Sequence, residues 1–166
     1  ISMGGWFCFR AAAFEPRIKR VIASSIAFDY MQAPGFPAQQ LAKLFFIRLR
    51  KLTNRLTLRK MGKDKMHAWS VSNMMYIADK KTPVDAMDVV LQLNEKNLHS
   101  ELVKQDVLIL TGREDHFIPF KMHDMQIRAL TNARSVTGRV FIREEQAQNH
   151  CQIGNVGLAL DVVVKW

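Results

Sequence analysis

The chain has 166 residues, of which 48% are hydrophobic and 23% charged, a composition typical of a globular domain with a sizeable core. It shows no apolar stretch of transmembrane length, no zinc-ligand spacing and no nucleic-acid-binding motif, so neither a membrane span nor a nucleic-acid partner is expected. Its two cysteines, Cys8 and Cys151, are too few for a disulfide framework. A reducing, cytoplasmic setting is therefore predicted, with a single disulfide as the alternative.

The first five residues, Ile1-Ser2-Met3-Gly4-Gly5, match a G-x-S-x-G nucleophile elbow if a glycine precedes Ile1. In that motif a sharp strand-to-helix turn holds a serine hydroxyl clear of the sheet, and the serine adopts a strained backbone. A side chain at Gly4 is expected to collide with the turn. The N–H of Met3 would form half of an oxyanion hole. Because Ser-x-Gly-Gly also occurs in ordinary loops, the interpretation requires an acid and a base elsewhere.

The next segments predict a helix and then a buried strand. Residues 6–14 contain three consecutive alanines and end before Glu15-Pro16, which favours a helix directly after the elbow. Residues 17–25 begin with basic side chains and continue with apolar ones, as a parallel strand between two helix layers does. Residues 1–28 are thus expected to form part of the core of an α/β domain.

Residues 29–104 are too long for a simple connection and predict an inserted helical cap. Apolar residues recur at helical spacing between Leu41 and Leu56, and Gly62 is expected to close that helix. A second helix is predicted over 66–79. Thr82 as N-cap and Pro83 at the first helical position start a third helix that runs through Leu93.

The cap carries much of the net charge of +9 and most of the ambiguous features. Cations between leucines favour a solvated face over a core; a face for a membrane surface or nucleic acid is the alternative, testable by salt-dependent retention on anionic vesicles or DNA. Four side chains could line an acyl or aromatic pocket, since methionine and aromatic residues adapt to apolar ligands, although core packing is the alternative for each. They are Trp69, Met74, Met75 and Tyr76.

Residues 105–166 return to the alternating pattern of a doubly wound sheet. The apolar run 107–110 breaks at Gly112 and delivers Asp115 just past the end of a strand. Helices are predicted over 119–130 and 153–166, with the last strand at 139–142. His150 lies in the polar loop before the terminal helix. The other four histidines, which lack a metal-ligand spacing, are assigned surface or packing roles: His67, His99, His116 and His123.

The order Ser2, Asp115, His150 is the triad order of α/β-hydrolases. On these three motifs the chain resembles the C-terminal part of an α/β-hydrolase, most closely the group of acylaminoacyl peptidases, dienelactone hydrolases and pseudooxynicotine-type hydrolases. The resemblance implies a doubly wound α/β fold with a helical cap. It also implies a missing N-terminal half that supplies further strands and the second oxyanion donor, so that the chain is expected to be a fragment and, with an open sheet edge, to form homo-oligomers.

The resemblance implies two-step nucleophilic catalysis without a metal or cofactor. His150 would accept the Ser2 proton, and Asp115 would fix the imidazole tautomer. Glu114 is the second choice for the acid, followed by Glu144 or Glu145. The small-molecule or peptide substrate would be cleaved at an ester, amide, thioester or activated carbon–carbon bond. A non-catalytic binding protein with the same fold is the alternative from another functional class.

Overall fold

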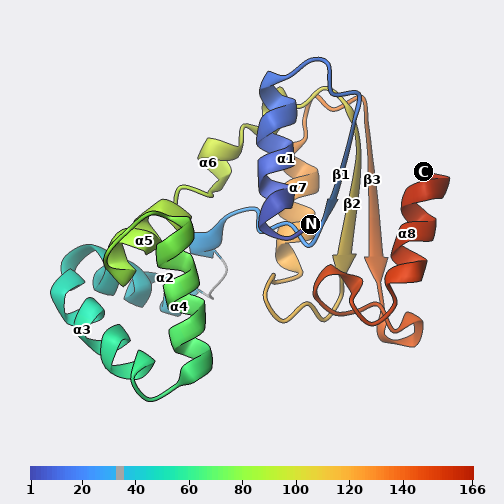
Figure 1. Cartoon of the computed structure of the whole chain (residues 1–166). Helices are drawn as coiled ribbons and strands as arrows, with labels where there is room; N and C mark the ends of the chain where they lie inside the picture. The colour runs from blue at the N-terminus through green and yellow to red at the C-terminus, as the bar shows by residue number, and fades with distance from the viewer. Residues whose placement is uncertain (33–35) are drawn as a thin grey trace. The chain divides into compact units, whose positions relative to one another are not determined.

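The computed structural model describes residues 1–32 and 36–166, and contacts within the chain divide it into two units (Figure 1). Unit 1 consists of residues 1–29 and 93–166, and unit 2 of residues 30–92. The segment 93–104, which the sequence assigns to the cap, lies in unit 1. Its helix α6 (Glu95–Leu98) packs against the first helix of that unit, and Leu98 is fully buried. Among the described residues, no helix combines the length and apolarity needed to span a membrane.

Unit 1 is built on a parallel sheet of three strands in the order β1-β2-β3, which confirms the predicted α/β fold class. The strands are β1 (Arg20–Ser24), β2 (Asp106–Gly112) and β3 (Ser135–Phe141). β1 begins three residues later than predicted, because the carboxylate of Glu15 accepts the N–H and the guanidinium hydrogen bonds of Arg17 and keeps that residue in a turn. β3 begins four residues earlier than predicted.

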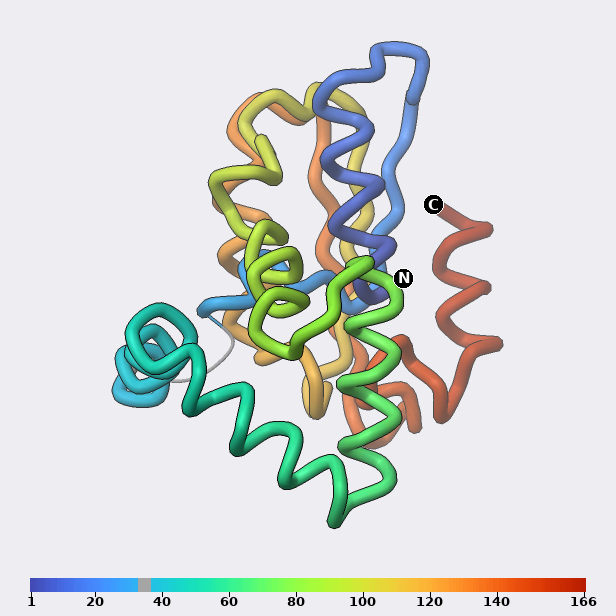
Figure 2. The backbone as a smooth tube through the Cα atoms, turned by 60° about the vertical axis from the view of Figure 1, so that its left-hand side comes forward, coloured from blue at the N-terminus to red at the C-terminus, as the bar shows by residue number. Residues whose placement is uncertain are grey.

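Helices cover both faces of this sheet (Figures 1 and 2). α1 (Met3–Phe14) and α7 (Lys121–Ala129) lie on one face, and α8 (Val156–Lys165) lies on the other. α1 buries Trp6, Phe9 and Ala12, which share one stripe of the helix, while α8 closes the core around Leu108 and Phe141. β2, in the middle, is buried along nearly its whole length, as the apolar run of its sequence predicts.

Unit 2 is helical. Its main elements are α2 (Phe36–Lys43), a π-helical turn (Leu44–Arg48), α3 (Arg50–Met61), α4 (Lys65–Ile77) and α5 (Pro83–Val90). The expectation of one continuous helix from Leu41 to Gly62 is wrong, because the chain leaves helical geometry at Leu49 (φ −109°, ψ 34°). The Thr53 hydroxyl donates to the carbonyl of Phe45 at 2.8 Å, and the Arg50 guanidinium donates to the carbonyl of Phe46 at 3.1 Å. These side chains satisfy carbonyls that the interruption frees from the helix.

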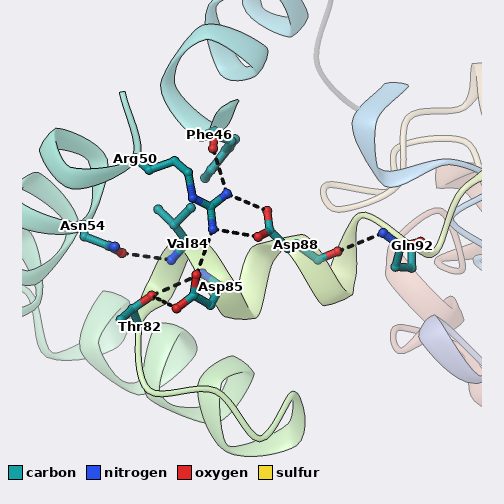
Figure 3. Close-up of polar contacts among 8 residues, drawn as sticks. All are labelled: Phe46, Arg50, Asn54, Thr82, Val84, Asp85, Asp88 and Gln92. Carbon is teal, nitrogen blue, oxygen red and sulfur yellow. Dashed lines mark hydrogen bonds and ion pairs between the residues drawn. The ribbon is translucent and has the colours of Figure 1, made fainter. Parts of the chain in front are cut away.

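An arginine joins α3 to α5 (Figure 3). The Arg50 guanidinium donates to both carboxylate oxygens of Asp88, at 3.0 and 2.7 Å, and to Asp85 at 2.8 Å. The predicted N-cap of α5 is confirmed, since the hydroxyl of Thr82 accepts the N–H of Asp85 at 3.3 Å and Pro83 occupies the first turn. The helix ends at Val90, three residues before the predicted end.

The leucines of α3 differ from the expectation that they cover a core. Leu52, Leu56 and Leu58 are between 44% and 53% exposed, and Thr53 is the buried residue of the helix. Thr53 is held inward by its hydrogen bond to the preceding turn. The apolar periodicity therefore predicts that this segment is helical, but it predicts neither the break at Leu49 nor the buried side of α3.

Candidate active site

Three segments meet at the carboxyl ends of the strands in unit 1. Ser2 directly precedes α1, Asp115 follows β2, and His150 follows β3. Because β1, β2 and β3 run parallel, the segments that leave their carboxyl ends emerge on the same side. The N–H of Ser2 donates to the carbonyl of Ser24 at 2.8 Å and fixes the first turn of the chain to the end of β1.

Ser2 adopts the strained backbone expected of a serine in an elbow, with φ 51° and ψ −129°. A Cβ at Gly5 would lie 3.5 Å from the Cβ atoms of Ala23 and Ile26, an ordinary van der Waals distance, so the space between α1 and the end of β1 does not require a glycine there. The expected collision at Gly4 is wrong: a Cβ at that position would have no neighbour within 4 Å. Gly4 lies on the exposed side of α1, whereas Gly5 lies on its buried side.

His150 is hydrogen-bonded on both sides of its ring. Its Nε2 lies 3.0 Å from Ser2 Oγ, and its Nδ1 lies 2.8 Å from Asp115 Oδ2. The carboxylate can only accept, so Nδ1 carries the proton and the lone pair of Nε2 faces the serine hydroxyl. The side chains of Asp115 and His150 are 0% and 14% exposed, so water has little access to their contact.

The Asp115 carboxylate is held in its ionised form by its surroundings. Burial by itself would raise the pKa of Asp115, but hydrogen bonds from the Ile118 N–H, from His150 and from the Phe117 N–H together bring it below its ordinary value. Both of these backbone donors lie 2.9 Å from Oδ1. The loop that follows Gly112 thus presents a fixed negative charge to the imidazole.

The alternative acids lie in other contacts. Glu114 forms an ion pair with Arg143, and Glu145 forms one with Arg139. Glu144 is exposed. The structure therefore brings Asp115 to His150 and engages both Glu114 and Glu145 with arginines.

Gly112 has a role that the sequence analysis missed. A Cβ on this residue would lie 2.3 Å from the carbonyl oxygen of Gln148 and 2.5 Å from that of Asn149. The histidine loop, residues 146–155, therefore lies directly on the end of β2, and the Glu114 N–H donates to the Gln148 carbonyl at 3.0 Å. The sequence analysis treats Gly112 only as the residue that ends a strand.

Two further residues missed by the sequence analysis are the serines at the end of β1. The Ser24 hydroxyl donates to Gln152 Oε1 at 2.7 Å, and Ser25 Oγ accepts the N–H of Cys151 at 2.9 Å. Both contacts join residues more than 120 positions apart. No local pattern in the sequence signals them.

The remaining histidines lie outside the Ser2–His150–Asp115 hydrogen-bond series. His123 is buried, its Nδ1 lies 2.9 Å from the Thr111 hydroxyl, and burial lowers its pKa. The ring of His116 lies beside that of His150, at 6.2 Å between centroids. In the part of the chain that the structure describes, no cluster of three or more His, Cys, Asp or Glu side chains is arranged to hold a metal ion.

The four residues predicted to contact substrate lie together on α4 in unit 2. Trp69 and Tyr76 are 65% and 85% exposed, and Met74 and Met75 are half-buried. Trp69 lines a shallow surface pocket of about 420 Å³ with Lys65 and Met66. Ser2, Asp115 and His150 lie in unit 1, so a role for the α4 residues in substrate binding stays a prediction.

Comparison with known proteins relates this arrangement to one fold. No protein-family model and no curated protein sequence matches the chain. Among solved structures, a candidate lipase of Acinetobacter baumannii is 14% identical with a TM-score of 0.59, and the match covers 99% of this chain and 57% of that one. An esterase of Pyrococcus furiosus is 14% identical with a TM-score of 0.52, over 97% of this chain and 48% of the other. A monoacylglycerol lipase of Paleococcus ferrophilus is 19% identical with a TM-score of 0.50, over 99% and 65%.

At these identities the matches define the fold alone. The chain has part of the α/β-hydrolase fold, with its three parallel strands and flanking helices. It spans about half to two thirds of the length of the structures it matches.

Proposed function

We propose that this chain supplies the nucleophile, base and acid of a serine hydrolase that cleaves an ester, amide or related acyl bond. The observation that carries the proposal is the unbroken hydrogen-bond series from Ser2 Oγ through His150 to Asp115, with contacts of 3.0 and 2.8 Å. Three loops distant in sequence supply these groups. The strained backbone of Ser2 supports the same assignment, because strain of this kind concentrates at functional sites.

The reaction begins when Ser2 Oγ attacks the carbonyl carbon of the substrate. His150 Nε2 takes the serine proton, a C–O bond forms, and the π electrons of the carbonyl move onto its oxygen. When the tetrahedral intermediate collapses, His150 returns the proton to the leaving group and an acyl-serine remains. A water molecule then repeats the sequence and releases the acid. Throughout, the Asp115 carboxylate accepts the hydrogen bond of Nδ1–H, which fixes the tautomer of His150 and stabilises the imidazolium.

The Met3 N–H is the proposed first donor to the developing oxyanion. Met3 begins α1, and the N–H groups in the first turn of a helix have no acceptor within it. The positive end of the helix dipole adds to their effect on a negative oxygen. The second donor would lie on a segment of the full-length protein outside residues 1–166, as it does in G-x-S-x-G enzymes generally.

The proposal extends to substrate and setting. Unit 2 would act as a cap whose Trp69, Met74, Met75 and Tyr76 contact an acyl group or a peptide side chain. Rates of hydrolysis of acyl esters, N-acylaminoacyl amides and lactones would then show whether the activity resembles that of the acylaminoacyl peptidase group or that of the dienelactone hydrolase group. Hydrolysis of a carbon–carbon bond would use the same three residues. Both cysteines are free thiols, which supports the cytoplasm as the setting.

The deciding experiment is covalent labelling of the full-length protein with a fluorophosphonate probe, followed by mapping of the modified peptide. The label is expected on Ser2, and it should disappear in Ser2→Ala but not in the control Ser70→Ala, which changes an exposed serine of α4. Labelling at another residue, or undiminished labelling of Ser2→Ala, contradicts the assignment of the nucleophile. A properly folded protein that takes no label at all would favour the non-catalytic alternative.

A further inference from the structure

Strained backbone gathers around the candidate site. Seven non-glycine residues among those described have a positive φ, and five of them lie in or next to the segments that form the site. They are Ser2 (φ 51°), Ser25 (φ 53°), Gln146 (φ 56°), Cys151 (φ 53°) and Gln152 (φ 55°). Such conformations are unfavourable for residues with a Cβ and persist only where surrounding contacts enforce them.

Cys151 and Gln152 are two consecutive left-handed residues directly after His150, so their conformation determines where the imidazole points. The Cys151 N–H donates to Ser25 Oγ at 2.9 Å, and the Gln152 side chain accepts the Ser24 hydroxyl at 2.7 Å. Ser24, Ser25 and Gln152 are 6%, 0% and 1% exposed. Because water has almost no access to these groups, it cannot replace the two hydrogen bonds if they are removed.

Ser25 is also tied to the strand that leads to the acid. Its N–H donates to the carbonyl of Leu110 in β2 at 2.9 Å, and Asp115 follows that strand. Its hydroxyl is in addition one of the groups that lower the pKa of Asp115. Ser25 thus connects β2 to the histidine loop.

The nucleophile is tied to the same two residues, since the Ser2 N–H donates to the Ser24 carbonyl at 2.8 Å. Ser24 and Ser25 therefore contact the nucleophile segment, the histidine loop and the strand that leads to the acid. Ser24 is the last residue of β1 and Ser25 follows it directly, and the end of a sheet strand is more rigid than a loop. We propose that Ser24 and Ser25 are positioning residues that hold Ser2, Asp115 and His150 in register, with the Ser25 hydroxyl the more important because it binds the backbone of Cys151, the residue next to His150. This inference rests on the proposed function.

The alternative is that these serines only satisfy buried polar groups. Ser100 is a matched control for that reading, because it is 2% exposed and its Oγ accepts a hydrogen bond from Gln126 Nε2 at 3.0 Å. It precedes the amino end of β2, and the candidate site lies at the carboxyl end. A purely structural role predicts that Ser25→Ala and Ser100→Ala behave alike.

The test compares Ser25→Ala, Ser24→Ala and Ser100→Ala in the full-length protein. The rate of fluorophosphonate labelling at Ser2 is measured against pH, and the Hδ1 proton of His150 is followed by NMR. Ser25→Ala is expected to slow labelling about 10-fold to 100-fold, Ser24→Ala less, and Ser100→Ala not at all at an equal change in melting temperature. The Hδ1 signal of His150 is expected to shift in Ser25→Ala and not in Ser100→Ala, because only the first substitution removes the acceptor of the N–H that follows His150.

Ser25→Gly guards against misfolding, because glycine adopts a φ of 53° without strain and lacks only the hydroxyl. It should reproduce the slow labelling of Ser25→Ala, whereas equal effects of Ser25→Gly and Ser100→Ala would overturn the positioning role. If the unsubstituted protein takes no label at Ser2, the proposed function fails, and the NMR signal still decides the inference. An unchanged His150 Hδ1 signal in Ser25→Gly would then overturn it.

Discussion

Asp115 and Glu114 are neighbours in the chain with opposite surroundings. The carboxylate of Asp115 is inaccessible to solvent and faces His150, while that of Glu114 is 42% exposed and pairs with Arg143. The hydrogen bond to Arg143 lowers the pKa of Glu114, so both groups are ionised near neutral pH. Their positions, rather than their ionisation states, therefore determine which of the two can act as the acid.

Asp115→Asn is therefore expected to lower kcat/KM, or the labelling rate at Ser2, by about 10⁴-fold, because an asparagine favours the wrong histidine tautomer. Glu114→Gln should change either rate by less than about threefold, since it alters only a surface ion pair. Steady-state kinetics of both variants at equal melting temperature provide the measurement. The reverse ranking would move the acid to Glu114.

The lowered pKa of Asp115 also predicts a pH dependence of stability. A carboxylate whose pKa is lower in the folded state stabilises the fold above its unfolded pKa of about 3.9, and this contribution disappears as pH falls through the folded value. Asp115→Asn should therefore flatten the acid side of a melting-temperature profile below about pH 4. Equal slopes for the unsubstituted protein and Asp115→Asn would show that the ionised carboxylate of Asp115 does not stabilise the fold.

Gly112 and Gly4 provide a matched pair of glycine substitutions. Gly112→Ala places a Cβ 2.3 Å from the Gln148 carbonyl, so the histidine loop must move, and a shift of about 1 Å at His150 is expected to cost about 100-fold in rate. Gly4→Ala meets no atom within 4 Å and should raise helix stability by up to about 1 kcal/mol. Thermal melts of both variants and kinetics of Gly112→Ala test the pair. A lower melting temperature for Gly4→Ala would restore the collision first expected there.

At the scale of elements, local signals predict what local forces decide. Thr82-Pro83 predicts the start of α5 because a cap and a fixed φ act within one turn. The interruption at Leu49 is not predictable from apolar spacing, since it depends on Thr53 bonding back to an earlier carbonyl. The first half of β3 is missed because four residues from Ser135 are largely exposed and do not read as a buried strand.

The cap of α5 is worth testing by substitution. Thr82→Ala removes the acceptor for the Asp85 N–H and should destabilise the protein by about 1 kcal/mol. Thr57→Ala, within α3, is the control, because alanine is the better helix former and no cap is lost there. Chemical denaturation followed by circular dichroism measures both. Equal stabilities for the two variants would show that the Thr82 cap contributes nothing.

At the scale of the molecule, the sequence predicts which groups meet but not what holds them. Ser2, Asp115 and His150 follow from motif order and from the rule that parallel strands end at one edge. The contacts of Ser24 with Gln152 and of Ser25 with Cys151 arise from the packing of the three strands, and no pattern of residue spacing in the sequence predicts them. Gly112 is visible as a glycine, yet its closeness to the histidine loop is a tertiary fact.

The sheet edge at β1 leads to the final prediction. β1 pairs only with β2 among the described strands, and Ile22 on this edge strand is 38% exposed because α8 packs over β2 and β3 instead. An open strand edge beside exposed apolar side chains favours pairing with another chain. Purified residues 1–166 are therefore expected to self-associate in light-scattering measurements at micromolar concentration.

Ile22→Lys should reduce this association, because a lysine on an edge strand opposes pairing, while Leu160→Lys on the exposed side of α8 should not. A monodisperse monomer without substitution would contradict the argument, and equal effects of the two lysines would place the contact away from β1.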